Sequence, residues 1–530
     1  MTHKLSAHSS RGVVTSPHGL ATQSGVDVLA RGGNAIEAAI ATVASLCVTY
    51  PHFCGLGGDA FLLISNAQGQ VQTISGIGQA ASDVGGYSGT IPLRGPRSAL
   101  TTAATVDALG QALAISQSQC QGTHSWAELL APAIALARDG FAISASERFW
   151  LGFRLAQGEA LPDIYTNYLC EGQVPPQGFI RRQGALAHTL EVLAERGPRD
   201  FYDGQLAQRI AAGLHASGSP LRAQDLARTH ARIEAPLQIS YRGGELLAHQ
   251  PPTQGVTTLQ IMGMLERFDF SQMAQGSADH YHLLVEAVKQ AFLDRNQFVA
   301  DPDFATVPLQ TMLSATRLQA GASAIRMDQA LPWPHPYQHG DTVYVGAADA
   351  AGNCVSMLAT VYFDWGSGVV VGDTGMVWHN RGASFSLQPG HPNMLAAGKR
   401  PFHTLNPGMY RKNGKVQLLY GTQGADGQPQ TLAAVLTRLI DYRMEPMAAL
   451  AAPRFLLGKT FSDSTESLKL EDDVAADVVA SLRKRGHAIS LVAAANPLMG
   501  HPGVIAIDPV GGGMTGAHDP RSDGLALGVE

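Results

Sequence analysis

The sequence predicts an α/β protein built from layers of helices and strands. Stretches with apolar residues at every third or fourth position alternate along the chain with short runs of strand-like residues. The 530 residues are 45% hydrophobic and 15% charged, which is enough apolar material for a large core. We find no linker and no internal repeat that would divide the chain. The pattern leaves the strand directions open.

The first elements are two helices within residues 17–48, separated by a break at residues 31–34 that contains two glycines. The second helix carries apolar residues at helical spacing beside a strip of alanines, namely Ile36, Ile40, Val43 and Cys47. We therefore expect it to be buried. Residues 61–65 and 70–74 flank a turn at residues 66–69 and predict a hairpin.

A helix is predicted at residues 126–138, because Ser125 is a good N-cap and Gly140 lies where a glycine commonly ends a helix. Further helical patterns occupy residues 186–196, 204–213 and 278–298. In the last of these, we expect Glu286 and Lys289 to lie on a solvated face.

The next predicted hairpin has strands at residues 342–349 and 354–361 and a turn containing Gly352. The preceding residues 331–341 contain three prolines and a glycine, so they can form neither a helix nor a central strand. We expect this loop to be exposed and mobile up to Asp341. A chain cut at that point would begin with Thr342.

Residues 366–371, rich in glycine and valine, predict another strand. A strand at residues 415–421 leads into a glycine-rich turn, followed by a helix at residues 430–442 with one apolar face. Such a turn points backbone N–H groups and the positive end of the helix dipole at whatever lies above it. This arrangement suits an oxyanion hole, although an ordinary strand-to-helix turn has the same pattern.

Composition and charge exclude several classes of function. The net charge is −6 and the basic residues are scattered, so we expect neither a nucleic-acid nor a membrane partner. The five cysteines lack C-x-x-C spacing, which argues against disulfides and a zinc site. No secretory leader and no apolar run of membrane-spanning length is evident. We therefore expect a cytoplasmic protein that acts on small molecules.

No cofactor or metal is expected. The histidines that invite a metal interpretation are His18, His52, His280 and His282. They include no pair at i, i+4 with a nearby carboxylate, so we interpret them as core or surface residues. The glycine-rich residues 55–59 lack the spacing of a phosphate-binding loop, and close backbone packing explains them better than nucleotide binding.

Thr342 could act as a catalytic nucleophile if cleavage made it the first residue of a chain. An N-terminal threonine carries its nucleophile and its base on one residue, because an α-amine titrates at about 7.7–8.0 and is partly free base near neutral pH. Local pattern alone favours an ordinary threonine at the start of a strand. The flanking motifs change that balance.

Three motifs carry a family resemblance: Thr342-x-Tyr-x-Gly, Asp-Ala-Ala-Gly-Asn-Cys-Val-Ser at 349–356 and Gly-Ser-Gly-Val-Val-Val at 366–371. Together they resemble the start of the small subunit of the gamma-glutamyltransferase family. The likeness covers nearly the whole chain, from Arg11-Gly-Val-Val to Asp519-Pro-Arg521.

The resemblance implies the four-layer αββα sandwich of the N-terminal nucleophile hydrolases. It also implies self-cleavage between Asp341 and Thr342 into a large piece, 1–341, and a small piece, 342–530. The two pieces would remain intertwined as a heterodimer, and a dimer of such heterodimers is left open.

Residue by residue, the resemblance assigns Thr342 as the nucleophile and Thr360 as the second threonine that supports it. Gly424 and Ala425 fall on the glycine pair that donates the oxyanion-hole N–H groups. Because alanine restricts positive φ, we expect a slightly altered geometry there. Asn380 matches an asparagine on the substrate side.

The departures from the family concern the groups that hold an α-amino acid. The substrate-binding positions that differ are Ile77 for an arginine, Arg381 for a glutamine, Ser384 for an acidic residue, His403-Thr404 for two serines, and Tyr362 for a smaller polar residue. A zwitterionic head group would thus lose its charged partners, which costs several kcal/mol for each buried charge. Gamma-glutamyl transfer is therefore not expected.

We interpret the chain as a self-processed amidohydrolase, most similar to the oxamate amidohydrolase branch of purine and allantoin breakdown. Arg381 would take a substrate carboxylate, and Tyr362 would fill the space of a gamma-glutamyl chain. The alternatives are a glutathione hydrolase or transferase, a cephalosporin or glutaryl acylase, and an inactive binding scaffold. Retention of Thr342, Thr360 and Gly424 argues against the scaffold.

Overall fold

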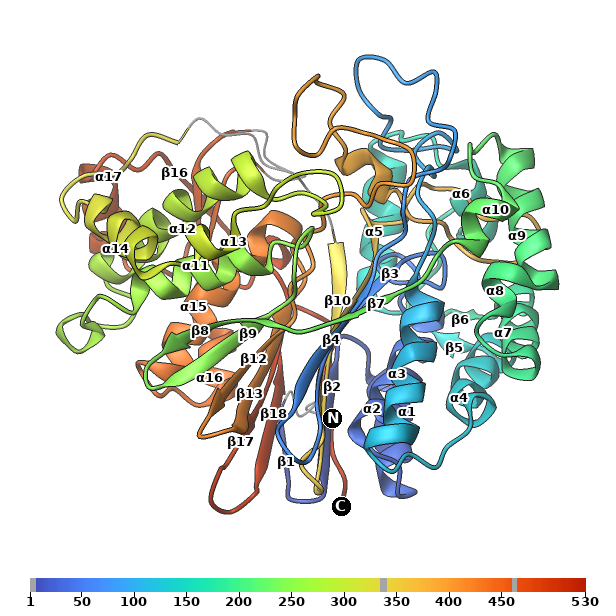
Figure 1. The fold of residues 1–530 in the computed structure, drawn as a ribbon, viewed down its shortest axis with the longest axis horizontal. Helices are drawn as coiled ribbons and strands as arrows, with labels where there is room; N and C mark the ends of the chain where they lie inside the picture. The colour runs from blue at the N-terminus through green and yellow to red at the C-terminus, as the bar shows by residue number, and fades with distance from the viewer. Residues whose placement is uncertain (1–5, 334–340, 460–464) are drawn as a thin grey trace.

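The computed structural model describes residues 6–333, 341–459 and 465–530. Two seven-stranded sheets face each other, and helices cover the outer face of each (Figure 1). Both sheets are antiparallel throughout. The predicted four-layer αββα arrangement is therefore confirmed.

The first sheet contains the strand that begins at the predicted cleavage site. Its order is β19 (Leu525–Gly528), β2 (Gly12–Ser16), β10 (Asp341–Asp349), β11 (Cys354–Tyr362), β3 (Asp59–Ser65), β4 (Val71–Gly76) and β7 (Arg232–Glu234). Both predicted hairpins, β3–β4 and β10–β11, are thus neighbours in one sheet.

The second sheet supplies the predicted oxyanion turn. Its order is β1 (Ser6–Ser9), β18 (Met514–His518), β17 (Pro502–Ile507), β13 (Lys415–Thr422), β12 (Gly408–Lys412), β9 (Gly244–Ala248) and β8 (Leu237–Tyr241). Two small sheets lie outside these layers, one of β14 (Phe455–Leu457), β15 (Leu468–Glu471) and β16 (Ile489–Val492), the other of β5 (Phe141–Ala142) and β6 (Ile180–Arg181).

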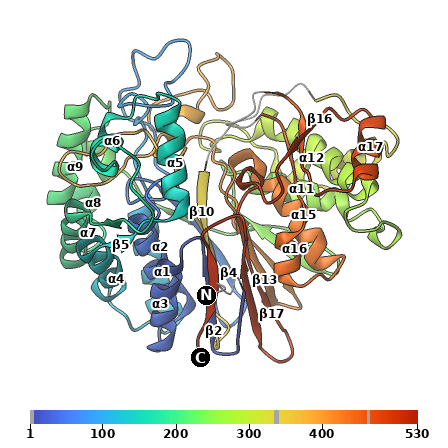
Figure 2. The ribbon, with the colours of Figure 1, turned by 180° about the vertical axis from the view of Figure 1, so that it is seen from behind.

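The helices divide between the two outer layers, as the views from front and back show (Figures 1 and 2). Beside the first sheet lie α1 (Gly19–Ala30), α2 (Ala35–Thr49), α3 (Thr105–Gln119), α4 (Trp126–Asp139), α5 (Ala145–Ala156), α6 (Pro162–Tyr168), α7 (Gly184–Arg196), α8 (Asp200–Asp203), α9 (Gln205–Ser217) and α10 (Ala223–Ala227). Beside the second lie α11 (Gly255–Leu265), α12 (Ala278–Phe298), α13 (Leu309–Met312), α14 (Ala315–Ala324), α15 (Gln428–Ile440), α16 (Pro446–Ala451) and α17 (Ala476–Lys484).

Each interface between layers has its own apolar core. The first sheet packs on α1 to α4 through a large cluster that includes Ile40, Leu62 and Val345. The second packs on α11, α12 and α15 through a cluster that includes Leu246 and Leu432. A smaller cluster joins the two inner faces of the sheets. The central strands are therefore buried on both faces.

Several helix ends follow from the predicted caps. Asn34 accepts the N–H groups of Ile36 and Glu37, while the Glu37 carboxylate accepts the N–H of Asn34, so a capping box starts the fully buried α2. Ser125 caps α4 in the same way. Helix α12 has the predicted ends, Ala278–Phe298.

Two expectations are wrong. Residues 366–371 form no strand: Gly366 and Gly368 have φ values of +53° and +76°, which break an extended backbone, and only Val370 bridges to Val377. Glu286 and Lys289 are not solvated. They form a buried ion pair of 2.7 Å, and both bind the backbone of Leu331.

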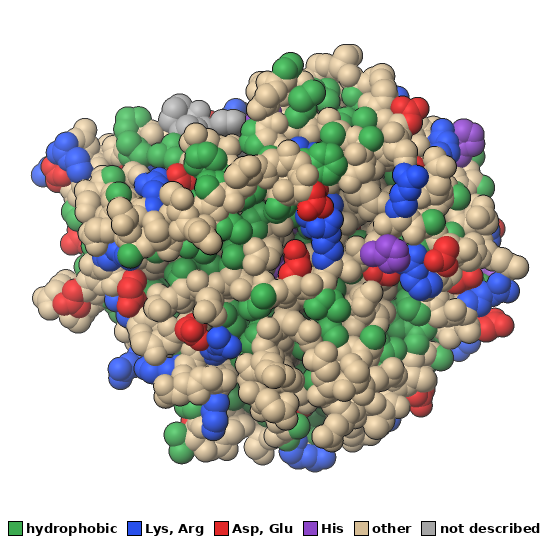
Figure 3. Space-filling model, in the orientation of Figure 1, with side chains coloured by type: hydrophobic (Ala, Val, Ile, Leu, Met, Phe, Trp, Pro, Cys, Tyr) green, Lys and Arg blue, Asp and Glu red, His purple; other side chains and the backbone are tan. Residues whose placement is uncertain are grey.

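The predicted mobile loop lies partly outside the described residues, at 334–340. Its last residue, Asp341, is the half-buried first residue of β10. All five cysteines are free thiols. In the described ranges, no helix combines the length and apolar character needed to cross a membrane. Acidic and basic side chains are interspersed on the face shown in Figure 3.

Candidate active site

The site begins with the two threonines of the β10–β11 hairpin. Thr342 is 2% exposed, and its hydroxyl has no hydrogen-bond partner among the described residues. On the neighbouring strand, the fully buried Thr360 hydroxyl donates to the carbonyl oxygen of Asp341 at 2.5 Å and accepts the N–H of Tyr362 at 2.7 Å. The carbonyl of the Asp341–Thr342 bond is thus polarised beside an unengaged hydroxyl.

The side chain of Asp341 lies in a buried charged cluster. Burial and the neighbouring Asp364 raise the pKa of Asp341 well above its usual range, while Arg154 and Arg94 oppose that rise. Arg154 binds the Asp364 carboxylate with two N–H groups at 2.5 and 2.7 Å, and Arg94 reaches the carbonyl of Asp364 at 2.6 Å. These contacts hold the segment that follows β11, next to the point where Asp341 pairs with Tyr362.

Packing between the two sheets involves Tyr344 of β10, the strand that carries Thr342, and β13, the strand before the Gly424 turn. Tyr344 lies two residues after Thr342 on β10, beyond an irregularity in the β10–β11 pairing between Asp341 and Val343. The Tyr344 ring occupies the space over Gly421 and Gly503, where an added Cβ would come within 2.3 and 2.6 Å of the ring. Ser356 also donates to the Tyr420 carbonyl across the sheets at 3.0 Å.

The predicted glycine-rich turn follows β13, and its backbone is strained at Ala425. Gly424 has a φ of +121°, and Ala425 adopts a φ of +43° despite its side chain. The left-handed region costs a non-glycine residue about 1–2 kcal/mol. Gln254 donates to the carbonyl of Ala425 at 2.7 Å and to that of Thr404 at 2.7 Å, and its own oxygen accepts from Arg295. This bridge holds the altered turn in place.

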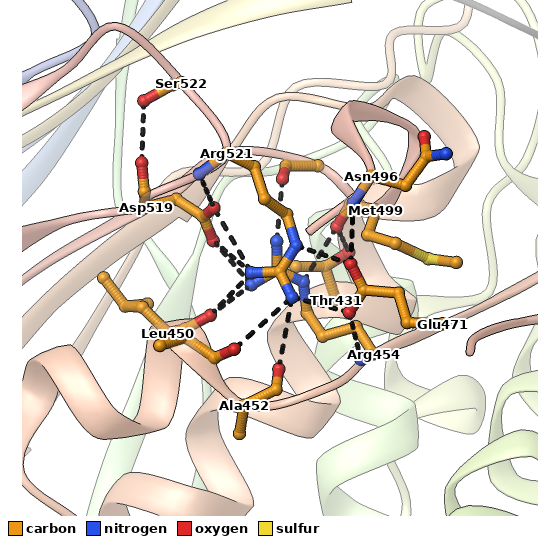
Figure 4. Close-up of polar contacts among 12 residues, drawn as sticks. Thr431, Leu450, Ala452, Arg454, Glu471, Asn496, Met499, Asp519, Arg521 and Ser522 are labelled. Atoms are coloured by element: carbon orange, nitrogen blue, oxygen red, sulfur yellow. Dashed lines mark hydrogen bonds and ion pairs between the residues drawn. The ribbon is translucent and has the colours of Figure 1, made fainter. Parts of the chain in front are cut away.

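Figure 4 shows a buried ionic network of Arg454, Arg521, Glu471 and Asp519. Arg454 is fully buried and donates to the carbonyls of Met499 and Gly500 at 3.0 and 2.9 Å and to Asp519 at 2.5 Å. Gly500 packs so closely on the turn that a Cβ would lie 2.8 Å from the Gln423 carbonyl. Arg454 thereby fixes the segment against which Gln423 and Gly424 pack.

Arg381 is the second notable group of the site. It starts η2 (Arg381–Ser384), is fully buried, and stacks at 3.6 Å over the ring of Tyr362. One N–H reaches the Thr404 hydroxyl at 3.3 Å, while Nε and Nη2 have no hydrogen-bond partner in the described chain. Burial lowers the pKa of Arg381 to about 10. A buried guanidinium with two unused donors is a ready site for an anion.

Sequence patterns gave no indication of Asp59, which lies opposite Thr360 in the pairing of β3 with β11. Its carboxylate is fully buried, accepts the N–H of Gly78 and lies 3.2 Å from His403 Nε2 and 3.5 Å from His379 Nδ1. Burial raises the pKa of Asp59 to about 7. The one sequence feature that could have drawn attention to Asp59 was its position directly after the glycine-rich residues 55–58.

Asn380 and Ser384, two of the predicted substrate-binding residues, both hydrogen-bond to backbone groups. Asn380 donates to the Leu93 carbonyl and accepts the N–H of Phe363. Ser384 donates to the Phe402 carbonyl. A cavity of about 740 Å³ opens beside them, lined by Ser384, Arg295 and Asp426 among others. The cavity therefore lies between η2 and Asp426, two residues after Gly424.

One cluster has the composition of a metal site. His282, Glu286 and His487 place ligand atoms within 4.8 Å of one another. These atoms already have protein partners, because His282 bonds His487 and both Glu286 oxygens are engaged by Lys289 and Leu331. The Lys289 ammonium, whose Nζ lies 2.7 Å from Glu286 Oε1, also repels a cation bound at this cluster.

The αββα fold, with a threonine at the start of a central strand of one sheet and a strained turn after a central strand of the other, defines the class of N-terminal nucleophile hydrolases. Comparison with known proteins gives the family: residues 21–529 match the model for gamma-glutamyltranspeptidase, and this chain belongs to that family. It is an enzyme of the hydrolase and acylase type.

Individual relatives cover nearly the whole chain. It is 42% identical to an oxamate amidohydrolase proenzyme of Klebsiella pneumoniae, over 98% of this chain and 99% of that one. It is 39% identical to a glutathione hydrolase-like proenzyme of Bacillus subtilis, over 98% of each. The crystal structure of a cephalosporin acylase from Bacillus halodurans superposes with a TM-score of 0.90 at 32% identity, covering 98% of this chain and 96% of that one.

Proposed function

We propose that this protein cuts itself between Asp341 and Thr342 and then hydrolyses oxamate to oxalate and ammonia. The observation that carries the substrate assignment is Arg381, a buried guanidinium without a carboxylate partner within ion-pair distance among the described residues. A small acid amide without an ammonium group supplies the missing anion. The name of the Klebsiella relative supports the same substrate.

Self-cleavage uses the geometry around the Asp341 carbonyl. Thr342 Oγ attacks this carbonyl carbon, the C–N bond breaks, and an ester forms while the nitrogen takes a proton. Water then opens the ester, leaving a carboxylate on Asp341 and a free α-amine on Thr342. The Thr360 hydroxyl, already bound to the carbonyl oxygen, stabilises the charge that develops there.

Turnover follows the same chemistry on a substrate. The new α-amine takes the Thr342 hydroxyl proton, Oγ attacks the amide carbonyl, and the protonated nitrogen leaves as ammonia. The N–H groups of Gly424 and Ala425 are the proposed oxyanion donors. Water hydrolyses the acyl ester and releases oxalate. Arg381 holds the carboxylate bonded directly to the reacting carbonyl.

A second candidate is hydrolysis of amides with a larger leaving group or acyl chain. The cavity of about 740 Å³ beside Ser384 and Asp426 could hold far more than ammonia. The similarity to a cephalosporin acylase structure is consistent with this substrate class. Glutathione is less favoured, because Ser384 and Ile77 offer no charged partner for an amino acid head group.

Mass spectrometry and a substrate panel test the proposal. Purified protein should appear as fragments 1–341 and 342–530, and Thr342→Ala should stay one chain without activity. Oxamate, glutathione and a glutaryl amide should then be compared by kcat/KM. An active uncut parent chain would refute self-cleavage, and preference for either of the other substrates would refute the oxamate assignment.

A further inference from the structure

We propose that Asp59 and His379 share one proton and thereby set the net charge of the pocket that receives the substrate carboxylate. Asp59 would be a specificity-determining residue that never touches the reacting atoms. The inference rests on the proposed function to the extent that Arg381 holds a substrate anion. It concerns a carboxyl and an imidazole for which the catalytic steps above have no use.

The hydrogen bonds around His379 fix where its proton lies. Its Nε2 faces the carbonyl oxygens of Thr101 and Thr102 at 3.1 and 2.9 Å, and carbonyls only accept. Nε2 therefore carries a hydrogen. In a neutral ring, Nδ1 is then a lone pair, and it faces Asp59 Oδ2 at 3.5 Å.

The hydrogen bonds of His403 fix the position of its ring hydrogen in the same way. Its Nδ1 accepts the N–H of Leu405 at 3.3 Å, so the hydrogen of the neutral ring is on Nε2, which donates to Asp59 Oδ2 at 3.2 Å. Asp59 Oδ1 accepts from Gly78. With an ionised Asp59, the contact to His379 would join two lone pairs. One proton between these two residues removes that conflict.

The burial of the cluster favours the proton on the carboxyl. Asp59, His379 and His403 are all fully buried. Burial raises the pKa of Asp59 to about 7 and lowers that of His379 to about 4. Burial and Arg381 hold the pKa of His403 well below its usual range. Below about pH 7, the cluster is therefore a neutral acid and two neutral imidazoles.

The surrounding groups leave Arg381 as the cation of this pocket. The charged and titratable groups facing the cluster are Arg381 from η2, Tyr202 from α8 and His249 after β9, while Tyr362 and Asp426 face Arg381 itself. Asp426 is already paired with Arg295 at 3.0 Å. A neutral Asp59 thus leaves one net positive charge, which matches one substrate carboxylate.

The consequence is a dependence of substrate choice on pH. When pH rises through the pKa of Asp59, the carboxyl loses its proton and its negative charge offsets Arg381. Binding of an anionic amide should then weaken, whereas binding of a neutral amide of the same shape should change little. Oxamate and oxamide form such a pair, because they differ only in replacement of the carboxylate by a second amide.

The test is the ratio of kcat/KM for oxamate to that for oxamide, since titration of the Thr342 amine cancels in it. In the parent, the ratio should fall about tenfold or more between about pH 6 and pH 9, with a midpoint near 7. In Asp59→Asn it should stay at its low-pH value throughout, because the amide N–H can face His379 as the acid proton does. Arg381→Gln is the control, in which the ratio should be small at every pH.

A measurement without substrate separates this inference from the proposed function. Infrared difference spectra of the parent between about pH 6 and pH 9 should show loss of a protonated carboxylic acid band, absent from Asp59→Asn. If that variant does not fold, His379→Gln should shift the band instead. A ratio independent of pH in the parent, or no such band, would overturn the inference. Absence of oxamate turnover with the band present would refute only the proposed substrate.

Discussion

Replacing Thr360 by valine should slow self-cleavage by about 10²–10³-fold. The Thr360 hydroxyl donates to the Asp341 carbonyl at 2.5 Å and accepts from the Tyr362 N–H at 2.7 Å. Valine has nearly the same shape but can make neither bond. Loss of one preorganised donor to a developing oxyanion typically raises the barrier by about 2.7–4 kcal/mol, which gives the stated factor.

A second cost arises in the ground state. Without the Thr360 oxygen, the buried N–H of Tyr362 loses its partner, which costs about 1–3 kcal/mol of stability. This residue has a φ of +80° and carries the ring on which Arg381 stacks, so it can shift only at the expense of the anion site. Thr360→Ser restores both hydrogen bonds and is the matched control.

The assay follows the intact chain and fragments 1–341 and 342–530 by mass spectrometry over time after synthesis. Thr360→Val should accumulate as the full-length chain, while the parent and Thr360→Ser should be cut. Circular dichroism of the uncut variant separates slow chemistry from misfolding. If folded Thr360→Val is cut at the parent rate, the hydroxyl has no role at the scissile carbonyl.

Two further predictions concern substrate binding and stability. Arg381→Gln should lower kcat/KM for oxamate, because the desolvated substrate carboxylate is left unpaired and the activation barrier rises by about 2–5 kcal/mol. Arg381→Lys should recover only part of this loss, because an ammonium group cannot make the two parallel hydrogen bonds of a guanidinium. An unchanged kcat/KM in Arg381→Gln would exclude Arg381 as the carboxylate site. Arg454→Met should destabilise the protein by about 3–5 kcal/mol, because the buried Asp519 carboxylate loses an ion-pair partner. It should also lower kcat, because the hydrogen bond that holds the Gly500 carbonyl beside the proposed oxyanion turn is lost. An unchanged melting temperature would contradict the stability prediction.

Local patterns predicted the elements that depend on local physics. The caps at Asn34 and Ser125 and the turn containing Gly352 specify their helix starts and hairpin through contacts within a few residues. The strand that begins at Thr342 was predictable for the same reason, but the role proposed for Thr342 came from the family motifs that flank it. The wrong strand at residues 366–371 shows the limit, because valines favour a strand only where the glycines between them leave the backbone extended.

Burial of charge could not be predicted from the sequence. Glu286 and Lys289 lie three residues apart on a helix, a spacing equally suited to a solvated pair. The structure buries them because Leu331, more than forty residues later, takes a hydrogen bond from one and gives one to the other. Asp59 is a stronger case, since its partner His403 is 344 residues away.

The site divides its tasks among separate parts of the fold. The proposed nucleophile Thr342 and Thr360 belong to the first sheet. The proposed oxyanion turn follows β13 of the second sheet, and Arg381 lies on η2 outside both. In the proposed mechanism, self-cleavage depends on the β10–β11 hairpin, whereas the choice of substrate depends on Arg381 of η2 and on Asp59. We therefore expect substitutions at Arg381 and Asp59 to change which acyl group is accepted while self-cleavage stays between Asp341 and Thr342.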